Sequence, residues 1–231
     1  MGHFSWFGLF AGHEMAEHIE HSVIATGVGL MLIVFAVVVG GKLRNVEAAM
    51  NPDDGVSARN FGEAFVEMIS GIAESVIGHH SEKYVPLLAS LFAFVFVANL
   101  LGLIPGVPPP TSNSNVTFGL GAVSFLAYNF YGLKAQGGGY LKHFFGPIAL
   151  LAPLFLIIEL FSHAFRPLSL GIRLYANMYA DHQVLGIFTD LTKFGVPVIF
   201  YALGAFVCVV QSFVFTILSA IYISLAVSHD H

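Results

Sequence analysis

Residues 168–182 read LSLGIRLYANMYADH and lie within an almost unbroken apolar run that extends from about residue 147 to 192. Arg173 stands near the middle of this stretch, and no acidic residue occurs within seven positions of it on either side. An arginine at the centre of a membrane helix costs about 2.5–3.5 kcal/mol on insertion scales. Because ionisable residues at that depth mark functional sites, the stretch indicates a membrane protein that uses this charge.

The rest of the chain has the composition of a membrane protein. Of its 231 residues, 56% are hydrophobic and only 10% are charged, whereas a soluble domain has about 25% charged residues. The single cysteine, Cys208, can form no intramolecular disulfide. The first twenty residues hold no Lys or Arg, so we expect no cleavable signal peptide. We therefore predict an all-α integral membrane protein with one membrane domain over residues 1–231.

Apolar runs of about 20 residues, enough to cross a bilayer at 1.5 Å per residue, divide the chain. The predicted segments are an external N-terminal segment at 1–21, span 1 at 22–41, span 2 at 84–104, span 3 at 116–133, a long helix or hairpin at 147–192 and a long last helix at 196–227. The last two exceed one upright crossing and are expected to be strongly tilted or nearly parallel to the membrane. The total is about five to six membrane helices.

Residues 57–78 have a different pattern, in which apolar residues recur at helical spacing between Arg59, Glu63, Glu67 and Glu74. This pattern predicts an amphipathic helix on the membrane surface. If the first three spans alternate in direction, the basic residues of the connections fall on one side; they are Lys42, Arg44, Arg59, Lys83, Lys134 and Lys142. The positive-inside rule makes that side cytoplasmic and places the N-terminus outside.

Polar residues follow one another at steps of three or four within the 147–192 run. They are Glu159, His163, Arg166, Ser169, Arg173, Asn177 and Asp181, called here the polar stripe. On a helical wheel all but Ser169 lie within about 40° of one line. Hydrogen bonds between helices would explain Ser169 or Asn177 alone. A row that includes two arginines instead indicates an ion pathway.

The chemistry of these residues differs from one to the next. The guanidinium of Arg173 keeps its proton, so it acts as a fixed positive charge that favours the ionised form of a nearby carboxylate and repels cations. Four neighbours on the same run can bind and release protons: Glu159, His163, Asp181 and His182. No acid lies within helical reach of Arg173, so we expect its partner carboxylate on another subunit.

The last apolar run adds a polar face of its own. Gln211 lies on it, with Gly204 seven residues before and Ser219 eight residues after. A buried Gln211 facing Arg173 would donate and accept hydrogen bonds without neutralising the charge. Packing between helices explains the same residue equally well.

Several stretches in the expected order resemble one protein family. RPLSLGIRLYANMYADH at 166–182, FVANLLGLIPG at 96–106 and QSFVFTILSAIYISLAVSHDH at 211–231 are similar to segments of subunit a of the F-type ATP synthase, the stator channel subunit of its membrane sector. The resemblance covers nearly the whole chain from the first span onward. The arginine and asparagine at a spacing of four, followed by a glutamine in the last helix, are its most specific part.

The resemblance implies a subunit that translocates protons and is not an enzyme on its own. Such a subunit faces a ring of c subunits, each with a membrane-embedded carboxylate, through two offset half-channels. Arg173 matches the arginine that separates the half-channels. Ser169, Asn177 and Gln211 match its polar neighbours, Glu159 matches a channel acid, and His182 falls where relatives carry Glu or His. The implied partners are the c-ring, b-type peripheral stalk subunits, the rest of the synthase and lipid, in a bacterial inner membrane, with no nucleic acid.

Three positions depart from the family pattern. Gly204 stands where some relatives place an ionisable His or Glu, Asn113 where many have an acid, and Ala176 where a glycine is usual. In some members the ionisable role at Gly204 is exchanged with the position of His182. These departures leave the detailed proton route open.

No cofactor is expected, and protons are the favoured ion because His163, His182 and Glu159 exchange them. Sodium stays open, since ion selectivity in this family resides mainly in the c-ring. The N-terminal GHEMAEHIEH places His13, Glu17 and His21 on one helix face but lacks the His-Glu-x-x-His zinc signature, so no metal is predicted.

Two other classes of function fit the sequence less well. An ion-coupled secondary transporter would show two related halves and a central substrate site, and the sequence shows neither. An intramembrane hydrolase needs a nucleophile and a base in contact. Ser162 and His163 are the only tempting pair, but adjacent residues on a helix point about 100° apart.

Overall fold

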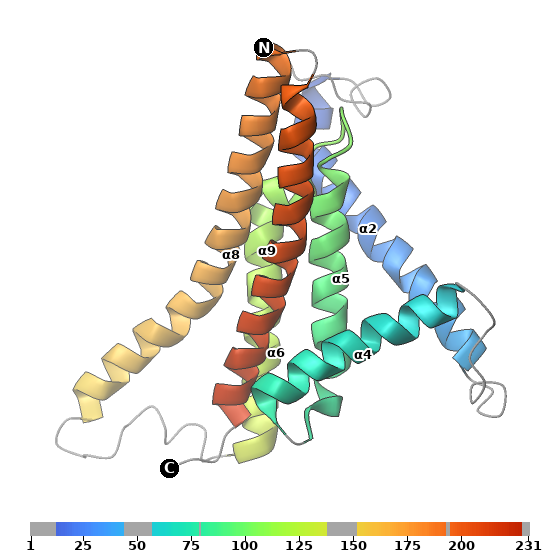
Figure 1. Ribbon diagram of the computed structural model, residues 1–231. Coiled ribbons are helices and arrows are strands. Elements are labelled where there is room, and N and C mark those ends of the chain that lie inside the picture. Colours follow the sequence, from blue (N-terminus) through green and yellow to red (C-terminus); the bar gives the residue numbers. More distant parts are fainter. Residues whose placement is uncertain (1–12, 44–56, 79, 138–151, 193–194, 228–231) are drawn as a thin grey trace.

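The computed structural model describes residues 13–43, 57–78, 80–137, 152–192 and 195–227 (Figure 1). Within these ranges the chain forms six α-helices, two short 3₁₀ turns and no strand. The elements are α2 (His13–Leu43), α4 (Ala58–Ile77), η1 (Ser81–Lys83), α5 (Val85–Leu101), η2 (Pro110–Ser112), α6 (Ser114–Gln136), α8 (Ala152–Leu191) and α9 (Val196–Val227). The predicted all-α class is confirmed.

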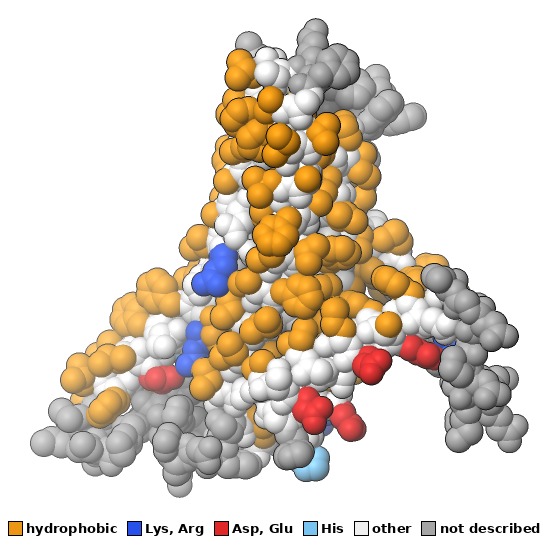
Figure 2. Space-filling view, in the orientation of Figure 1, with side chains coloured by type: hydrophobic (Ala, Val, Ile, Leu, Met, Phe, Trp, Pro, Cys, Tyr) orange, Lys and Arg blue, Asp and Glu red, His pale blue; other side chains and the backbone are white. Residues whose placement is uncertain are grey.

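Four of these helices, α2, α6, α8 and α9, contain segments long and apolar enough to cross a membrane. The helix α5 is also apolar but shorter, at 17 residues. Large hydrophobic side chains are exposed along α2, α6, α8 and α9, and they cover most of the face in Figure 2. An apolar exterior of this extent fits a protein whose surface meets lipid. The predicted orientation of the last two helices relative to the membrane stays a prediction.

In Figure 1, α5, α6 and α9 run alongside one another with the upper part of α8, while α4 crosses the lower part of this bundle. Two clusters of buried side chains hold the bundle together. The upper cluster joins α5, α8 and α9 through Leu91, Leu174 and Phe215, and the lower one joins α4, α5, α6 and α9. Because lipid tails are as apolar as leucine, close packing rather than withdrawal from water holds such helices together.

The predicted amphipathic helix at 57–78 is present as α4. Ser57 caps its start by accepting a hydrogen bond from the Asn60 amide at 3.2 Å, and Gly78 ends it with φ of 85°. Ile69 is fully buried beneath the bundle, whereas glutamates point outward along the helix. Figure 2 shows these acidic side chains along the lower edge of the molecule. The apolar face therefore decides where α4 packs.

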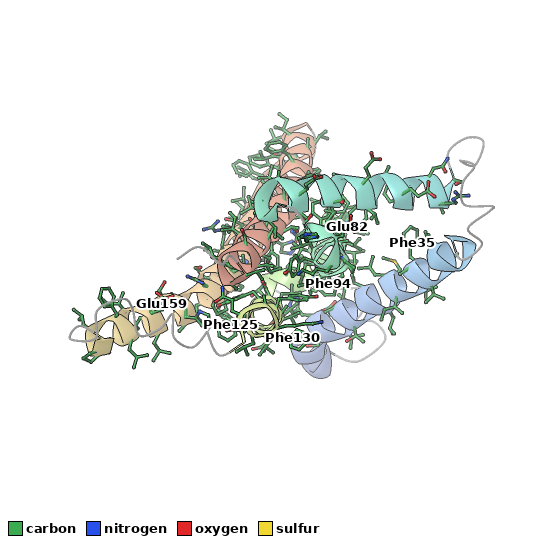
Figure 3. The ribbon with its side chains drawn as sticks, turned by 90° about the horizontal axis from the view of Figure 1, so that it is seen from below. Phe35, Glu82, Phe94, Phe125, Phe130 and Glu159 are labelled. Carbon is green, nitrogen blue, oxygen red and sulfur yellow. The ribbon has the colours of Figure 1, made fainter. Side chains whose placement is uncertain are left out.

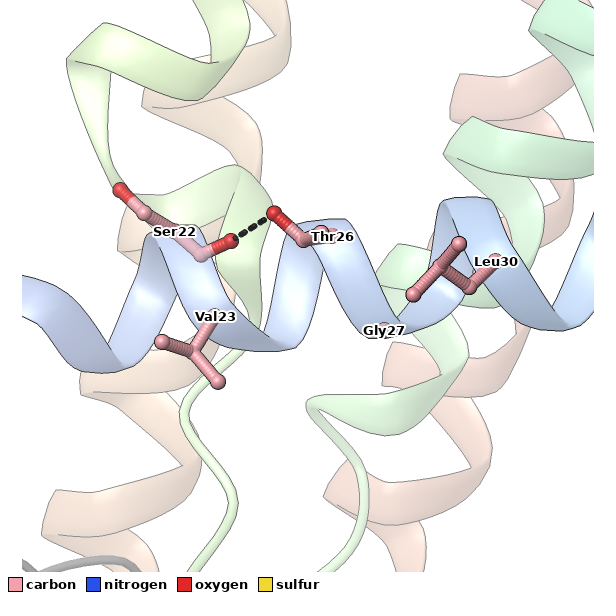
Figure 4. Close-up of a pocket in the computed structure, with 5 residues that line it drawn as sticks. All are labelled: Ser22, Val23, Thr26, Gly27 and Leu30. Carbon is pink, nitrogen blue, oxygen red and sulfur yellow. Dashed lines mark hydrogen bonds between the residues drawn. The ribbon is translucent and has the colours of Figure 1, made fainter.

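One side of α2 carries a hollow lined by Ser22, Val23, Thr26, Gly27 and Leu30 (Figure 4). The hydroxyl of Thr26 donates to the Ser22 carbonyl oxygen at 2.8 Å, so the helix satisfies this polar group itself. All five residues belong to the one helix, and the hollow is predominantly apolar. It is a feature of the helix surface and does not enclose a site.

Glycines allow α6 and α8 to approach backbone to backbone. A Cβ on Gly121 would lie 2.7 Å from the carbonyl oxygen of Pro167, and one on Gly171 would lie 3.2 Å from the carbonyl oxygen of Thr117. Small residues at such crossings are typical of membrane helix pairs. Pro167 lies inside α8, whose lower half leans away from the bundle in Figure 1. The contacts at Gly121 and Gly171 thus set how closely α6 approaches α8, the helix that carries the polar stripe.

We expect Gly121→Ala to destabilise the fold by about 1–3 kcal/mol, the usual cost of overpacking, because the new methyl group meets backbone that cannot rotate away. Gly119→Ala, two residues earlier on α6, is the matched control, since nothing lies within 4 Å of its Cβ position. The measurement is the temperature at which half of the detergent-solubilised protein aggregates. Equal midpoints for the two variants would contradict the close approach.

Candidate functional site

The whole polar stripe lies on one continuous helix, α8. The prediction left a helix or a hairpin open over 147–192, and the described part from Ala152 to Leu191 is a single helix. Exposure differs along the stripe. His163 is buried, Glu159, Arg166, Asp181 and His182 are half-buried, and Ser169, Arg173 and Asn177 are exposed. The stripe therefore follows the margin between the packed face of α8 and its outer face.

Arg173 is exposed and makes no hydrogen bond or ion pair with any residue that the structure describes. Nearby positions of α8 and α9 expose apolar side chains, among them Ile172 and Phe206. Figure 2 shows Lys or Arg side chains on the α8 side of a mostly hydrophobic surface. An arginine on a lipid-depth apolar surface needs a partner charge, and within the described residues it has none.

One helical turn from Arg173, the amide of Asn177 joins α8 to α9. Its Nδ2 donates to Oε1 of Gln211 at 2.7 Å, and Gln211 is only 3% exposed. Gln211 thus lies beside the polar stripe, as the sequence indicated. The described hydrogen bond of Gln211 is to Asn177, and whether its side chain also faces Arg173 stays a prediction. Two amides can pair this way without altering the charge of the arginine.

Gly204 of α9 leaves room for a carboxylate. A Cβ built on it would lie 2.9 Å from Oδ2 of Asp181 and 2.9 Å from Cδ2 of Leu103. The position that lacks an ionisable side chain of its own is therefore filled by the carboxylate of Asp181 from α8. The contact thus brings a carboxylate to position 204, where the resemblance led us to expect an ionisable residue. The sequence alone did not predict this contact.

A second polar group lies lower in the bundle, where α6 meets α8. Nε2 of His163 is 2.8 Å from Oδ1 of Asn129, and the hydroxyl of Tyr128 is 3.3 Å from the same nitrogen. Phe125 packs its ring edge-on against the imidazole at 5.2 Å. Figure 3 shows Phe125 on α6 toward the α8 end that carries Glu159. Tyr128 and Asn129 were missed, although a Tyr-Asn pair inside an apolar span is a visible signal.

Arg166 has neighbours that Arg173 lacks. Its Nη2 lies 3.8 Å from Oε1 of Glu159, and its guanidinium lies 5.8 Å from the centre of the Tyr222 ring. The carboxylate of Glu159 and the ring of Tyr222 both stabilise the positive charge of Arg166. The two arginines of the stripe are therefore not equivalent, and Arg173 is the one whose charge is not met within the described chain.

Of the other two departures, Asn113 has a structural explanation and Ala176 has none. Asn113 caps α6 by accepting a hydrogen bond from the Asn115 amide at 2.9 Å, a task suited to asparagine. Nearby, Thr111 donates to Asn99 at 2.6 Å in a fully buried pair. Ala176 is exposed on α8. Within the described residues, none of these side chains forms a hydrogen bond or ion pair with Arg173.

Taken together, a fixed positive charge stands on α8 with groups that can exchange protons on either side of it along the helix. Asp181 and His182 lie toward the end of α8, and His163 and Glu159 lie toward its start. Such an arrangement can hold an anion at Arg173 and pass protons at two separate places.

Comparison with known proteins identifies the family of this chain. The family model described as ATP synthase A chain matches residues 22–224. The chain is 48% identical to ATP synthase subunit a of Bdellovibrio bacteriovorus over 99% of both chains. It is 40% identical to ATP synthase subunit a of Sorangium cellulosum over 96% of this chain and 89% of the relative. It is also 43% identical to ATP synthase subunit a of Geobacter sulfurreducens over 75% of this chain and 76% of the relative. On these matches, which span nearly its full length, the chain belongs to the ATP synthase subunit a family.

Proposed function

We propose that this protein is the ion-translocating stator subunit of a bacterial ATP synthase and that Arg173 is the charge that meets the carboxylates of a c-subunit ring. The single observation that carries the proposal is the position of Arg173, exposed on an apolar face without a partner among the described residues. A carboxylate that arrives opposite the guanidinium is held ionised, so it has released its proton before it passes. The same charge repels a proton that would cross directly.

We assign the proton-exchanging groups of α8 to two half-channels. Asp181, which lies beside Gly204, and His182 belong to the outer one. Glu159 and His163 belong to the inner one. Ser169, Asn177 and Gln211 supply uncharged hydrogen-bonding groups between them. A proton enters by one half-channel, rides the ring as a carboxylic acid and leaves by the other, so that its flow turns the ring.

The proposed setting is a bacterial inner membrane. The N-terminus lies outside and α4 lies at the cytoplasmic surface, below the bundle in Figure 1. The subunit assembles with the c-ring, b-type peripheral stalk subunits and the remaining synthase, and its outer apolar surface meets lipid. It performs no chemistry on ATP itself, and the coupling ion is the proton.

A disulfide cross-link tests the proposed interface. In a Cys208→Ala background, Ala180→Cys lies two turns from Arg173 on the exposed side of α8. We expect it to form an adduct, under mild oxidation of the assembled synthase, with a cysteine placed beside the c-subunit carboxylate. Ala122→Cys, also exposed but on α6, is the matched control and should form none. An adduct from α6 alone, or from neither helix, would argue against the proposed face.

A further inference from the structure

The imidazole of His163 is the most enclosed ionisable group of the polar stripe, and α6 supplies the residues around it. His163 is 8% exposed. The rings of Phe125 and Tyr128 both lie edge-on to the imidazole, with centroids 5.2 Å away. Rings packed this way leave the imidazole little freedom to turn. Contacts from a neighbouring helix therefore fix the plane of the ring.

Asn129 fixes which nitrogen of that ring carries the hydrogen. Its Nδ2 donates to the carbonyl oxygen of Phe125 at 2.7 Å, one turn earlier on α6. Its Oδ1, which can only accept, is then the atom 2.8 Å from Nε2 of His163. A neutral imidazole in this position donates from Nε2, so Nδ1 is the nitrogen at which a proton is gained or lost. The hydroxyl of Tyr128 lies near both ring nitrogens, 3.3 Å from Nε2 and 3.5 Å from Nδ1.

The charged and titratable groups around the imidazole come from three helices. On α8 they are Glu159, one turn before His163, and Arg166, one turn after it, which form an ion pair at 3.8 Å. On α6 it is Tyr128, and on α9 it is Tyr222, which lies under Arg166. Pro167, four residues after His163, has no N–H to donate within the helix. The imidazole therefore has charged and polar groups near it, Glu159 among them.

We propose that Asn129 and Tyr128 of α6 are positioning residues that hold His163 in one tautomer, so that its imidazole relays protons along the inner half-channel. This inference rests on the proposed function. In the synthesis direction, Nδ1 takes the proton released by the ring carboxylic acid while Nε2–H continues to donate to Asn129. The same proton then leaves Nδ1 toward Glu159 and the inner solution. No other bond is made or broken, and no electron is transferred.

The test is a double-mutant cycle read as ATP-driven proton pumping in inside-out vesicles that carry the whole synthase, normalised to ATP hydrolysis. Asn129→Leu keeps the size of the side chain and removes its acceptor. We expect Asn129→Leu and His163→Leu each to lower pumping about tenfold, below the usual range for a positioned proton-transfer group because water still carries some flux. The double variant should pump no worse than His163→Leu, because Asn129 acts only through the imidazole. If Asn129 merely supported the fold, the double variant would pump less than His163→Leu.

Two further variants complete the design. Tyr128→Phe removes only the hydroxyl and should lower pumping in the natural background but not in the His163→Leu background. It keeps the test decisive if Asn129→Leu fails to assemble. Phe130→Leu, beside Asn129 but 62% exposed, is the control and should pump normally. Losses that multiply in both cycles, or single variants that pump normally, would overturn the inference.

A separate variant distinguishes this inference from the proposed function. If Arg173→Ala leaves pumping intact, the proposed function itself fails. If Arg173→Ala stops pumping while the variants of His163, Asn129 and Tyr128 pump normally, only the relay through His163 fails.

Discussion

Replacing Arg173 by alanine is expected to abolish ATP-driven proton pumping while the synthase continues to hydrolyse ATP when its catalytic sector is released from the membrane. Without the guanidinium, nothing forces a passing carboxylic acid to release its proton, and nothing separates the two half-channels. The loss should be complete, because no other described cation is exposed on the outer face of α8. The measurement is quenching of a pH-sensitive dye in inside-out vesicles, in buffer free of sodium.

Arg166→Ala is the matched control, because the same residue is removed from the same helix. Its charge is already met by Glu159 and Tyr222, so we expect pumping to persist, at a lower level. Arg173→Lys is a stricter comparison. Lysine keeps the positive charge but not the planar, forked geometry of the guanidinium. Arg173→Lys should therefore pump little better than Arg173→Ala. Coupled pumping in Arg173→Ala would refute the proposed role, and pumping that requires sodium in the unmodified protein would correct the proposed ion.

Periodicity along the chain predicted the helices well, because each pattern is local. The charged residues of 57–78 fall at the spacing of a helix, and Ser57 and Gly78 stand where a helix can begin and end. The polar stripe on α8 follows from the same rule of spacing. Arg173 stands out in the sequence as an arginine with no acid nearby, and the family resemblance assigns it the central role. That role stays a prediction; the side chain is exposed and has no partner among the described residues.

Contacts between helices could not be predicted in the same way. Asn177 and Gln211 are 34 residues apart, and their bond exists because α8 and α9 pack at that level. His163 and Arg173 belong to one stripe, yet the first is buried and the second exposed. Around His163, α6 supplies Tyr128 and Asn129, whereas Arg173 has no partner among the described residues. Spacing gives the direction of a side chain, but only packing decides what covers it.

The contact of Asp181 with Gly204 leads to the second large effect, a loss that can be reversed from the opposite helix. We expect Asp181→Gly to lower ATP-driven pumping about a hundredfold, because it removes the carboxylate that we assign to the outer half-channel. Gly204→Asp alone should also impair pumping. Its side chain starts 2.9 Å from Oδ2 of Asp181, so two carboxylates would crowd one space and repel each other.

Combining the two changes should restore much of the pumping, since Asp181→Gly with Gly204→Asp supplies one carboxylate to the same space from α9 instead of α8. The exchange keeps the number of helical glycines constant, so their cost of about 1 kcal/mol each does not change between the natural and the double variant. Asp190→Gly makes the same substitution at an exposed position later on α8 and should leave pumping close to normal. If the double variant pumps no better than Asp181→Gly, a carboxylate in this space is not sufficient for pumping. Asp181 must then act through a contact that only a side chain of α8 can make.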